Sequence, residues 1–302
     1  MKKLLILPLM VVALLISNCS KDEDPITTAG GGGGGGGGGD SCETEFLASM
    51  EPEKRKVVLE DFTGVRCGYC PDGHLRAKAF SDANPGNVFI VAVHSGSYAK
   101  PASGWANFTN STADAINQQA YPIGYPAGTV NRIKFDKYLQ KSQSGAVSKL
   151  AMSRGSWATA GGEVLAMSAP VNLGSKATYN EATRELTVKV DLYYTAEETE
   201  TNNLSVFLLQ DGLVSKQSGG GDNYVQNHVL RTSINGSWGD PIVEETKVGS
   251  KVSKVYTYTL PEDYNGTGVT GGGAVVVEDL EIVSFVSRGQ LEILNATSTT
   301  IK

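Results

Sequence analysis

Two apolar runs lie close together between residues 57 and 93. Residues 57–59 and 88–93 are continuously hydrophobic, and each run ends in a turn or a polar position. Such runs are typical of strands that are buried on both faces, as in a parallel sheet. The stretch that begins at residue 70 has helical character between them. The pattern therefore predicts a right-handed strand–helix–strand unit whose two strands end at the same edge of the sheet.

The second half of the chain changes to a period of two. Apolar residues alternate with polar ones from residue 186 to 192 and again from 256 to 260. Short alternating strands separated by turn clusters favour an antiparallel β-sandwich of the Ig-like kind. Further strands are expected at 204–209, 274–277, 280–286 and 291–294.

These two patterns predict two folded domains. Residues 43–160 are expected to form an α/β domain, closed by a helix over residues 136–152 that turns Leu139, Val147 and Leu150 toward the sheet. Residues 161–302 are expected to form the all-β sandwich. A chain of 302 residues is long enough for both.

Composition excludes some classes of protein. The formal net charge is −6 and no cluster of Lys or Arg occurs, which argues against nucleic-acid binding. Only four cysteines are present, too few for a disulfide-stapled scaffold.

A C-x-x-C pair lies where the first strand is expected to turn into the helix. Cys67 and Cys70 are separated by two residues, and Pro71 follows at a position that a first helical turn tolerates. A thiol at a helix N-terminus faces unpaired N–H groups and the positive end of the helix dipole, which favours the thiolate. Arg66 adds a positive charge beside it. We therefore expect Cys67 to be the nucleophile, with Cys70 shielded and placed to resolve a mixed disulfide.

Three kinds of site are compatible with this pair: a redox-active dithiol, a structural disulfide, and half of a zinc site. Zinc needs a second pair of ligands, and the sequence has no other C-x-x-C and no His-x-His. No metal site is therefore predicted, and the first two interpretations stay open.

The segment EDFTGVRCGYCP at residues 60–71 resembles the active-site strand, turn and helix of the thioredoxin superfamily. It is still more similar to the Omp28-related outer-membrane lipoproteins of the Bacteroidetes, and residues 227–240 resemble a second stretch of that family. The resemblance implies a thioredoxin-like first domain. It also implies that Asp61 is a buried acid that accepts the proton of Cys70, and that Pro126 is a cis-proline facing the sulfurs. The residues alone allow Asp61 to be an ordinary turn-forming residue.

Three further residues have two interpretations each. His94 ends the second apolar run and is expected beside Cys67, either as a second base or as a satisfied polar residue. His74, four residues after Cys70, has the same alternatives. Cys42 is left over, as a free thiol or as the site of a bridge to another chain.

The N-terminus has the pattern of a bacterial lipoprotein signal. Two lysines precede a short apolar segment, and LISNC at residues 15–19 resembles a lipobox, so residues 1–18 are predicted to be a cleaved signal peptide. Cys19 would then carry the lipid, and two acyl chains anchor a protein stably. Residues 19–42 contain ten consecutive glycines and are predicted to be a flexible tether. Its acidic start resembles the export signal of surface lipoproteins, with a solvated charge run as the alternative.

We interpret the chain as a lipid-anchored, surface-exposed protein of the bacterial outer membrane. The expected function is thiol–disulfide exchange with protein thiols and disulfides, in which a partner redox protein supplies or takes electrons and no cofactor is needed. The alternative is a non-catalytic binding or adhesion lipoprotein in which Cys67–Cys70 is structural and the second domain binds a surface ligand.

Overall fold

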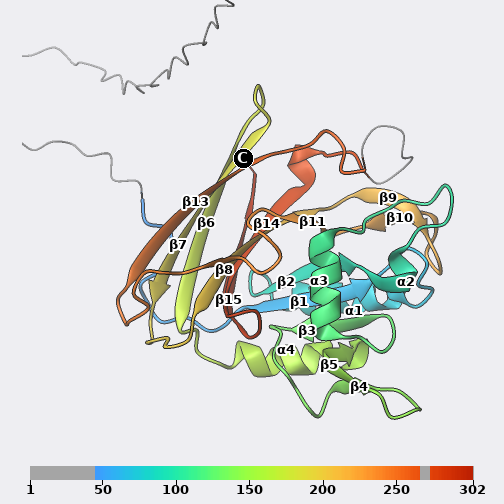
Figure 1. Ribbon diagram of the computed structural model, residues 1–302, viewed down its shortest axis with the longest axis horizontal. Coiled ribbons are helices and arrows are strands. Elements are labelled where there is room, and N and C mark those ends of the chain that lie inside the picture. The colour runs from blue at the N-terminus through green and yellow to red at the C-terminus, as the bar shows by residue number, and fades with distance from the viewer. Residues whose placement is uncertain (1–44, 266–272, 302) are drawn as a thin grey trace, which may run out of the picture. The chain divides into compact units, whose positions relative to one another are not determined.

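The computed structural model describes residues 45–265 and 273–301, and residues 45–302 form one compact unit. The predicted signal peptide, Cys19, the glycine run and Cys42 lie outside the described residues. Strands predominate within them, in one sheet of ten strands, one of three and one of two (Figure 1). No helix in this part of the chain is long and apolar enough to cross a membrane.

The predicted strand–helix–strand unit is present. Strands β1 (Val57–Thr63) and β2 (Val88–His94) are parallel neighbours, and every residue of both is buried. Helix α1 (Cys70–Asp82) connects them. Strand β3 (Ala127–Val130) runs antiparallel on the other side of β1. The continuous apolar runs thus correspond to strands at the centre of the sheet, as their pattern indicated.

The helix predicted over residues 136–152 is wrong. The chain instead forms β4 (Leu139–Lys141) and β5 (Val147–Ser153), and the helix that follows is α4 (Trp157–Leu165). Gly145, at φ +88°, reverses the chain between the two strands, a conformation that glycine adopts without strain. The three apolar residues that suggested one helical face belong to two antiparallel strands.

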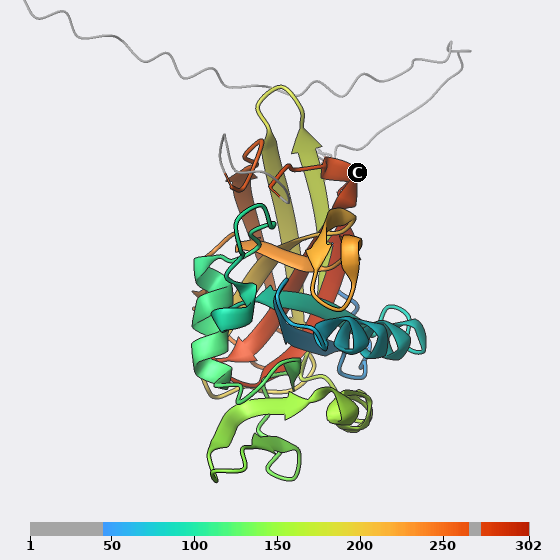
Figure 2. The ribbon, with the colours of Figure 1, turned by 90° about the vertical axis from the view of Figure 1, so that its right-hand side faces the viewer.

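Helices cover both faces of the central sheet (Figure 2). Helices α1 and α4 pack on one face, where Phe80 and Trp157 meet Leu59 of β1. Helix α3 (Ser111–Ala120) packs on the other face, with Ile116 in the same cluster as Phe62. The short α2 (Gly96–Ala99) lies in the segment between β2 and α3. Burial on both faces explains why β1 and β2 lack polar alternation.

Strands from beyond residue 160 continue the same sheet. Its order is β15-β14-β8-β11-β2-β1-β3-β5-β4, with β12 beside β8. The junction lies between β11 and β2, where the Ala92 N–H donates to the His228 carbonyl oxygen at 2.8 Å. Strands from both sides of the boundary expected at residue 160 therefore share one sheet. The added strands are β8 (Asn202–Gln210), β11 (Val229–Ser233), β12 (Asp240–Pro241), β14 (Leu280–Arg288) and β15 (Ile293–Thr300).

A second, three-stranded antiparallel sheet covers this extension. It consists of β6 (Val171–Asn180), β7 (Glu185–Tyr194) and β13 (Lys251–Thr259). Its apolar side packs against β8 and β14, so the alternating pattern is confirmed as one face of a two-layer packing.

One of the expected short strands is wrong, and another begins two residues later than expected. Residues 274–277 form only an isolated bridge at Ala274, followed by the 3-10 turn Val277–Asp279. The last strand begins at Ile293 rather than at residue 291, because Leu291 belongs to the turn in which its N–H donates to the Arg288 carbonyl.

The two-stranded sheet is a hairpin that the sequence patterns did not predict. Strands β9 (Leu213–Gln217) and β10 (Gly221–Gln226) pair antiparallel, and a short turn of small residues joins them. The hairpin lies outside the large sheet.

Candidate functional site around the Cys67–Cys70 disulfide

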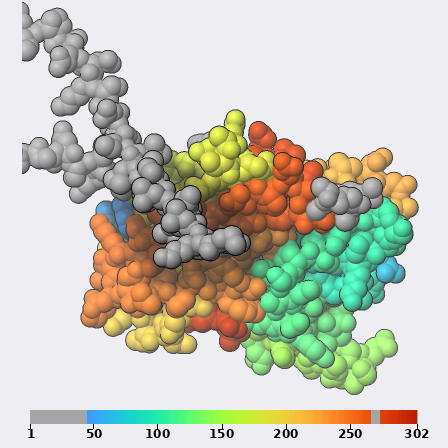
Figure 3. Space-filling model, turned by 45° about the horizontal axis from the view of Figure 1, so that its top comes forward, coloured from blue at the N-terminus to red at the C-terminus, as the bar shows by residue number. Residues whose placement is uncertain are grey.

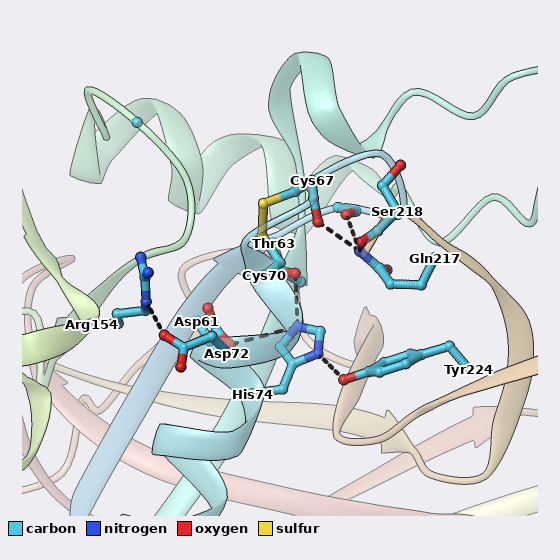
Figure 4. The surroundings of a disulfide bond; sticks show 12 residues. Asp61, Thr63, Cys67, Cys70, Asp72, His74, Arg154, Gln217, Ser218 and Tyr224 are labelled. Carbon is cyan, nitrogen blue, oxygen red and sulfur yellow. Dashed lines mark hydrogen bonds and ion pairs between the residues drawn. A yellow bond between two sulfur atoms is a disulfide. The ribbon is translucent and has the colours of Figure 1, made fainter. Parts of the chain in front are cut away.

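Cys67 and Cys70 form a disulfide at the start of α1 (Figure 4). The turn after β1 is closed by two backbone hydrogen bonds, from Cys67 N–H to the Gly64 carbonyl at 2.9 Å and from Cys70 N–H to the Cys67 carbonyl at 3.3 Å. Cys70 is the first residue of α1 and Pro71 lies in the first turn. The predicted location of the pair between strand and helix is confirmed.

Both cysteines are buried. Cys67 is 2% exposed and Cys70 is fully buried, whereas Arg66 and Tyr69 beside them are exposed. The sequence predicted that Cys70 would be shielded and did not predict it for Cys67. The structure shows that Cys67 is shielded as well. The residues that bury Cys67 include ones from the second half of the chain, which the local sequence around the pair does not indicate.

The β9–β10 hairpin lies on the turn that holds Cys67 (Figure 4). The side-chain amide of Gln217 donates to the carbonyl oxygens of Cys67 at 2.9 Å and Gly64 at 3.1 Å. The Ser218 N–H donates to the Val65 carbonyl at 2.8 Å. The turn preceding α1 is thus hydrogen-bonded along its length by the hairpin.

Gly219 makes this close approach sterically feasible. A Cβ atom on Gly219 would lie 2.2 Å from the carbonyl oxygen of Gly68, and the residue has φ +75°. The hairpin also packs on the segment between β2 and α3. Leu213, at the start of β9, lies in one cluster with Phe108, and the Lys216 ammonium lies over the Trp105 ring. In Figure 3 the gold surface of the hairpin borders the teal surface of that segment.

Asp61 is a buried acid with no partner of its own. It lies within β1, opposite Ala92 of β2 and Gly128 of β3, and is 1% exposed. Neither carboxyl oxygen has a hydrogen-bond partner. Burial raises the pKa of Asp61 to about 8, because the charged form loses its hydration. The turn-forming interpretation of Asp61 is therefore wrong, and the carboxyl is largely protonated at neutral pH.

His74 is the residue of α1 that faces Asp61. Its Nε2 lies 3.9 Å from the Asp61 Oδ2 and is hydrogen-bonded to the Thr63 hydroxyl at 2.8 Å. Its Nδ1 is hydrogen-bonded to the Tyr224 hydroxyl at 2.8 Å. Burial, and then the charge of His228, lower the pKa of His74 to about 4, so the imidazole is neutral at pH 7. Tyr224 comes from β10 and was not found by sequence reasoning.

Unlike His74, which faces Asp61, His94 and Arg66 contact other residues. His94 is buried with its ring at 4.9 Å from that of Phe108, and neither ring nitrogen has a hydrogen-bond partner. Burial, followed by the charges of His74 and Arg231, lowers the pKa of His94 to about 3. The interpretation of His94 as a satisfied polar residue is thus wrong. Arg66 is exposed, and its backbone N–H donates to the Tyr98 carbonyl oxygen at 3.0 Å.

Pro126 lies against α1. The Tyr125–Pro126 peptide bond is cis, as the thioredoxin resemblance implied. The proline ring approaches α1 at Gly73, where an added Cβ would lie 2.9 Å from the Pro126 Cβ. Gly73 is three residues after Cys70, so Pro126 contacts the first turn of the helix that carries the disulfide.

A cavity of about 470 Å³ opens beside this group of polar residues. Asp61, His74 and Tyr224 line it together with apolar residues of α1, β2 and β10, namely Leu75, Ala77, Ile90, Ala92 and Val225. His228 and Asp211 also line it. Within residues 45–265 and 273–301, no group of three or more His, Cys, Asp or Glu side chains is arranged to hold a metal ion.

Residues 113–301 match the family of outer membrane protein Omp28. The chain belongs to this family. The matched residues include β3, the β9–β10 hairpin and the three-stranded sheet, whereas the disulfide precedes them. The family name points to the outer membrane. No curated protein matches this Omp28-family chain.

Solved structures with a similar fold are known. HBP35 of Porphyromonas gingivalis is 21% identical, with a TM-score of 0.61, and the match covers 82% of this chain and 76% of that one. A protein from Agrobacterium tumefaciens is 11% identical, with a TM-score of 0.49 and coverage of 82% and 95%. At 21% identity the likeness to HBP35 concerns the fold alone.

Proposed function

We propose that this outer-membrane protein is a lipid-anchored thiol–disulfide oxidoreductase with a thioredoxin-like site at Cys67 and Cys70. The observation that carries the proposal is Asp61, a buried acid without a hydrogen-bond partner, 3.9 Å from His74 of the helix that bears the disulfide. A buried polar group without a partner destabilises a fold, by about 1–3 kcal/mol. Strongly perturbed carboxyls of this kind are typical of acid–base sites.

The proposed reaction begins with the reduced protein. The Cys67 thiolate attacks one sulfur of a substrate disulfide, forms a mixed disulfide and releases one substrate thiolate. The ionised Asp61 carboxyl takes the proton of the Cys70 thiol, and the resulting thiolate attacks the Cys67 sulfur. The Cys67–Cys70 bond forms as the second substrate thiolate leaves, so that two electrons pass to the substrate. A partner redox protein returns two electrons to Cys67–Cys70.

Burial of both cysteines favours a second candidate function. A disulfide under a hydrogen-bonded hairpin resembles a structural bridge, whose sulfurs react slowly. In that case the chain is a non-catalytic surface lipoprotein, and the strands that follow residue 160 bind a ligand outside the cell.

Trapping of mixed disulfides distinguishes these two functions. In a Cys42→Ala background, Cys70→Ala should accumulate mixed disulfides with envelope proteins through Cys67, because the resolving thiol is missing. Cys67→Ala in the same background should trap few. Failure of Cys70→Ala to trap more than Cys67→Ala would rule out exchange and leave the binding function.

The anchor and its exposure are separate parts of the proposal. The lipobox-like LISNC motif supports lipidation of Cys19, and the acidic residues after it support export to the surface. Cys19→Ala should release the protein from the membrane fraction once the signal peptide is removed. Alanine at Lys21, Asp22 and Glu23 should protect the chain from protease added to intact cells. An unchanged distribution or unchanged cleavage would contradict the corresponding part.

A further inference from the structure

The carboxyl oxygens of Asp61 are shielded from water. Both are buried, although other atoms of the residue line the 470 Å³ cavity. In the proposed reaction this carboxyl must gain one proton and lose one in every cycle. A group that is sealed in this way needs an intermediate that touches both the acid and the solvent.

His74 occupies that intermediate position. Its Nε2 is 3.9 Å from the Asp61 Oδ2, a separation that a movement of about 1 Å converts to a hydrogen bond. The Thr63 hydroxyl, bonded to the same nitrogen at 2.8 Å, keeps this edge of the ring toward β1. Neutral imidazole accepts at one nitrogen and donates at the other, so it can pass a proton across the ring.

Tyr224 continues the path to the cavity. Its hydroxyl lies 2.8 Å from the His74 Nδ1, and its side chain is half-buried at the cavity wall. The hydroxyl both donates and accepts hydrogen bonds. Asp61, His74 and Tyr224 thus form a line from the sealed acid to a space that solvent can enter (Figure 4).

We infer that His74 and Tyr224 carry protons between Asp61 and the solvent of the cavity, and so act on the cysteines through Asp61. The inference rests on the proposed exchange function. Before resolution, the Asp61 proton passes to His74 Nε2 while the Nδ1 proton passes to the Tyr224 oxygen, whose own proton goes to water. The ionised carboxyl then takes the Cys70 proton, and no net proton is stored.

Few other charges act on this line. The charge of His228, beside β11, lowers the pKa of His74. The charge of His74 in turn lowers the pKa of His94 on β2. Arg231 acts on His94. Lys78, one turn further along α1, is bonded to Asp82 at the outer rim of the cavity.

The test separates the reaction of Cys67 from the step that needs the relay. The reduced protein, with Cys42→Ala, is mixed with dithiobis-nitrobenzoate. A first coloured thiolate leaves when Cys67 attacks the reagent, and a second leaves when Cys70 attacks the resulting mixed disulfide. The first phase reports Cys67 and its accessibility, whereas the second reports deprotonation of Cys70 by Asp61.

The variants should change the second phase alone. At pH 7, His74→Ala should slow it about a hundredfold, at the lower end of the usual general acid–base contribution, and Tyr224→Phe should slow it less, about tenfold. Both should approach the original rate well above pH 8, where Asp61 is ionised in any case. Imidazole should accelerate His74→Ala, since it can enter the cavity, but should not accelerate Asp61→Asn.

Lys78→Ala is the matched control, because it alters the same helix and the same cavity without touching Asp61. Both of its phases should equal those of the parent protein and should be insensitive to imidazole. Two results would overturn the relay while leaving exchange intact. One is a second-phase rate that is the same in all variants. The other is a slow second phase whose rate is restored neither by raising the pH nor by imidazole. Absence of the first phase in the parent protein would overturn the exchange function, and the relay with it.

Discussion

The side-chain amide of Gln217 donates a hydrogen bond of 2.9 Å to the carbonyl oxygen of Cys67, across 150 positions of sequence. Gln217 is fixed in turn by the amide of Gln226, which donates to its Oε1 at 2.8 Å. A residue of the second half of the chain therefore holds the turn that contains Cys67. The hairpin thus fixes the backbone of the turn at Gly64, Val65 and Cys67 through hydrogen bonds to their carbonyl oxygens.

Gly219→Ala should make the disulfide easier to reduce. The new Cβ would lie 2.2 Å from the Gly68 carbonyl oxygen, so the hairpin must withdraw from the turn. Overpacking costs about 1–3 kcal/mol, and each 1.36 kcal/mol corresponds to about tenfold in a rate. We expect reduction by dithiothreitol to accelerate about tenfold or more, as followed by quenching with an alkylating agent.

Gly221→Ala is the control for that experiment. Gly221 also has positive φ, at +95°, but an added Cβ would meet nothing within 4 Å. It shares the backbone strain and lacks the collision, so its reduction rate should stay near that of the original protein. Equal acceleration in both variants would show that strain in the hairpin, and not its contact with Gly68, controls the disulfide.

Gly73→Ala should destabilise the protein through Pro126. The Cβ would lie 2.9 Å from the Pro126 Cβ and 3.0 Å from its Cγ, and neither atom can rotate away. We expect a loss of about 1–3 kcal/mol in the free energy of unfolding, measured by urea denaturation. Gly162→Ala, within α4 with open space around it, should instead stabilise by up to about 1 kcal/mol. A stable Gly73→Ala variant would mean that the proline is not held against α1.

The parts that the sequence predicted correctly depend on local patterns. The apolar runs and the C-x-x-C between strand and helix are determined by neighbouring residues. The bounds of β2 are therefore nearly correct, and β1 begins where predicted but continues four residues further, through Glu60, Asp61 and Thr63. The helix predicted over residues 136–152 is wrong because its three apolar residues fit either one helix face or two strands. Gly145, whose positive φ reverses the chain, favours the two strands.

The part of the site that the sequence did not predict comes from the β9–β10 hairpin, which is distant along the chain from the cysteines. The hairpin carries a local signal, three glycines between two short segments that contain Val214 and Tyr224, which would have identified a turn. Nothing in that signal indicates which surface the hairpin covers. The contacts of Gln217 with Cys67 and of Tyr224 with His74 join residues 150 positions apart, and periodicity along the chain does not encode such pairs.

Asp61 should make stability decrease as the pH rises. Burial raises its pKa from 3.8 to about 8, so the native state keeps a proton that the unfolded state releases. The stabilisation is complete below about pH 4 and is lost as the pH rises toward 8. The loss is roughly 1.4 kcal/mol per unit of pH within this window. Asp61→Asn lacks a titrating group and should not show it.

The measurement is urea denaturation of both proteins between pH 4 and 9, with the disulfide intact. His74 and His94, whose pKa values are lowered to about 4 and about 3, give the opposite trend below about pH 6.5. Because both proteins contain these histidines, the difference between the two curves isolates Asp61. A difference that does not change with pH would contradict the raised pKa of Asp61.

Arg132→Met should be among the most destabilising single changes near the site. The Arg132 guanidinium donates to the Glu60 Oε1 at 2.6 and 2.9 Å, and both side chains are almost completely buried. Removing the cation leaves Glu60 with only the Thr129 hydroxyl, at 2.7 Å, to stabilise a buried charge. Breaking such a pair costs about 3–5 kcal/mol, which urea denaturation would measure.

The double variant Glu60→Gln with Arg132→Met tests whether the stranded charge causes this loss. A neutral amide needs less solvation than a carboxylate, so the double variant should recover part of the stability that Arg132→Met loses. Lys134→Met, which breaks the exposed pair with Asp136, should have no measurable effect. If the double variant is no more stable than Arg132→Met, the loss comes from the packing of Arg132 on Trp238 and Phe285 instead. Because Glu60 precedes Asp61 in β1, the same comparison shows whether the ion pair holds the strand that places the acid.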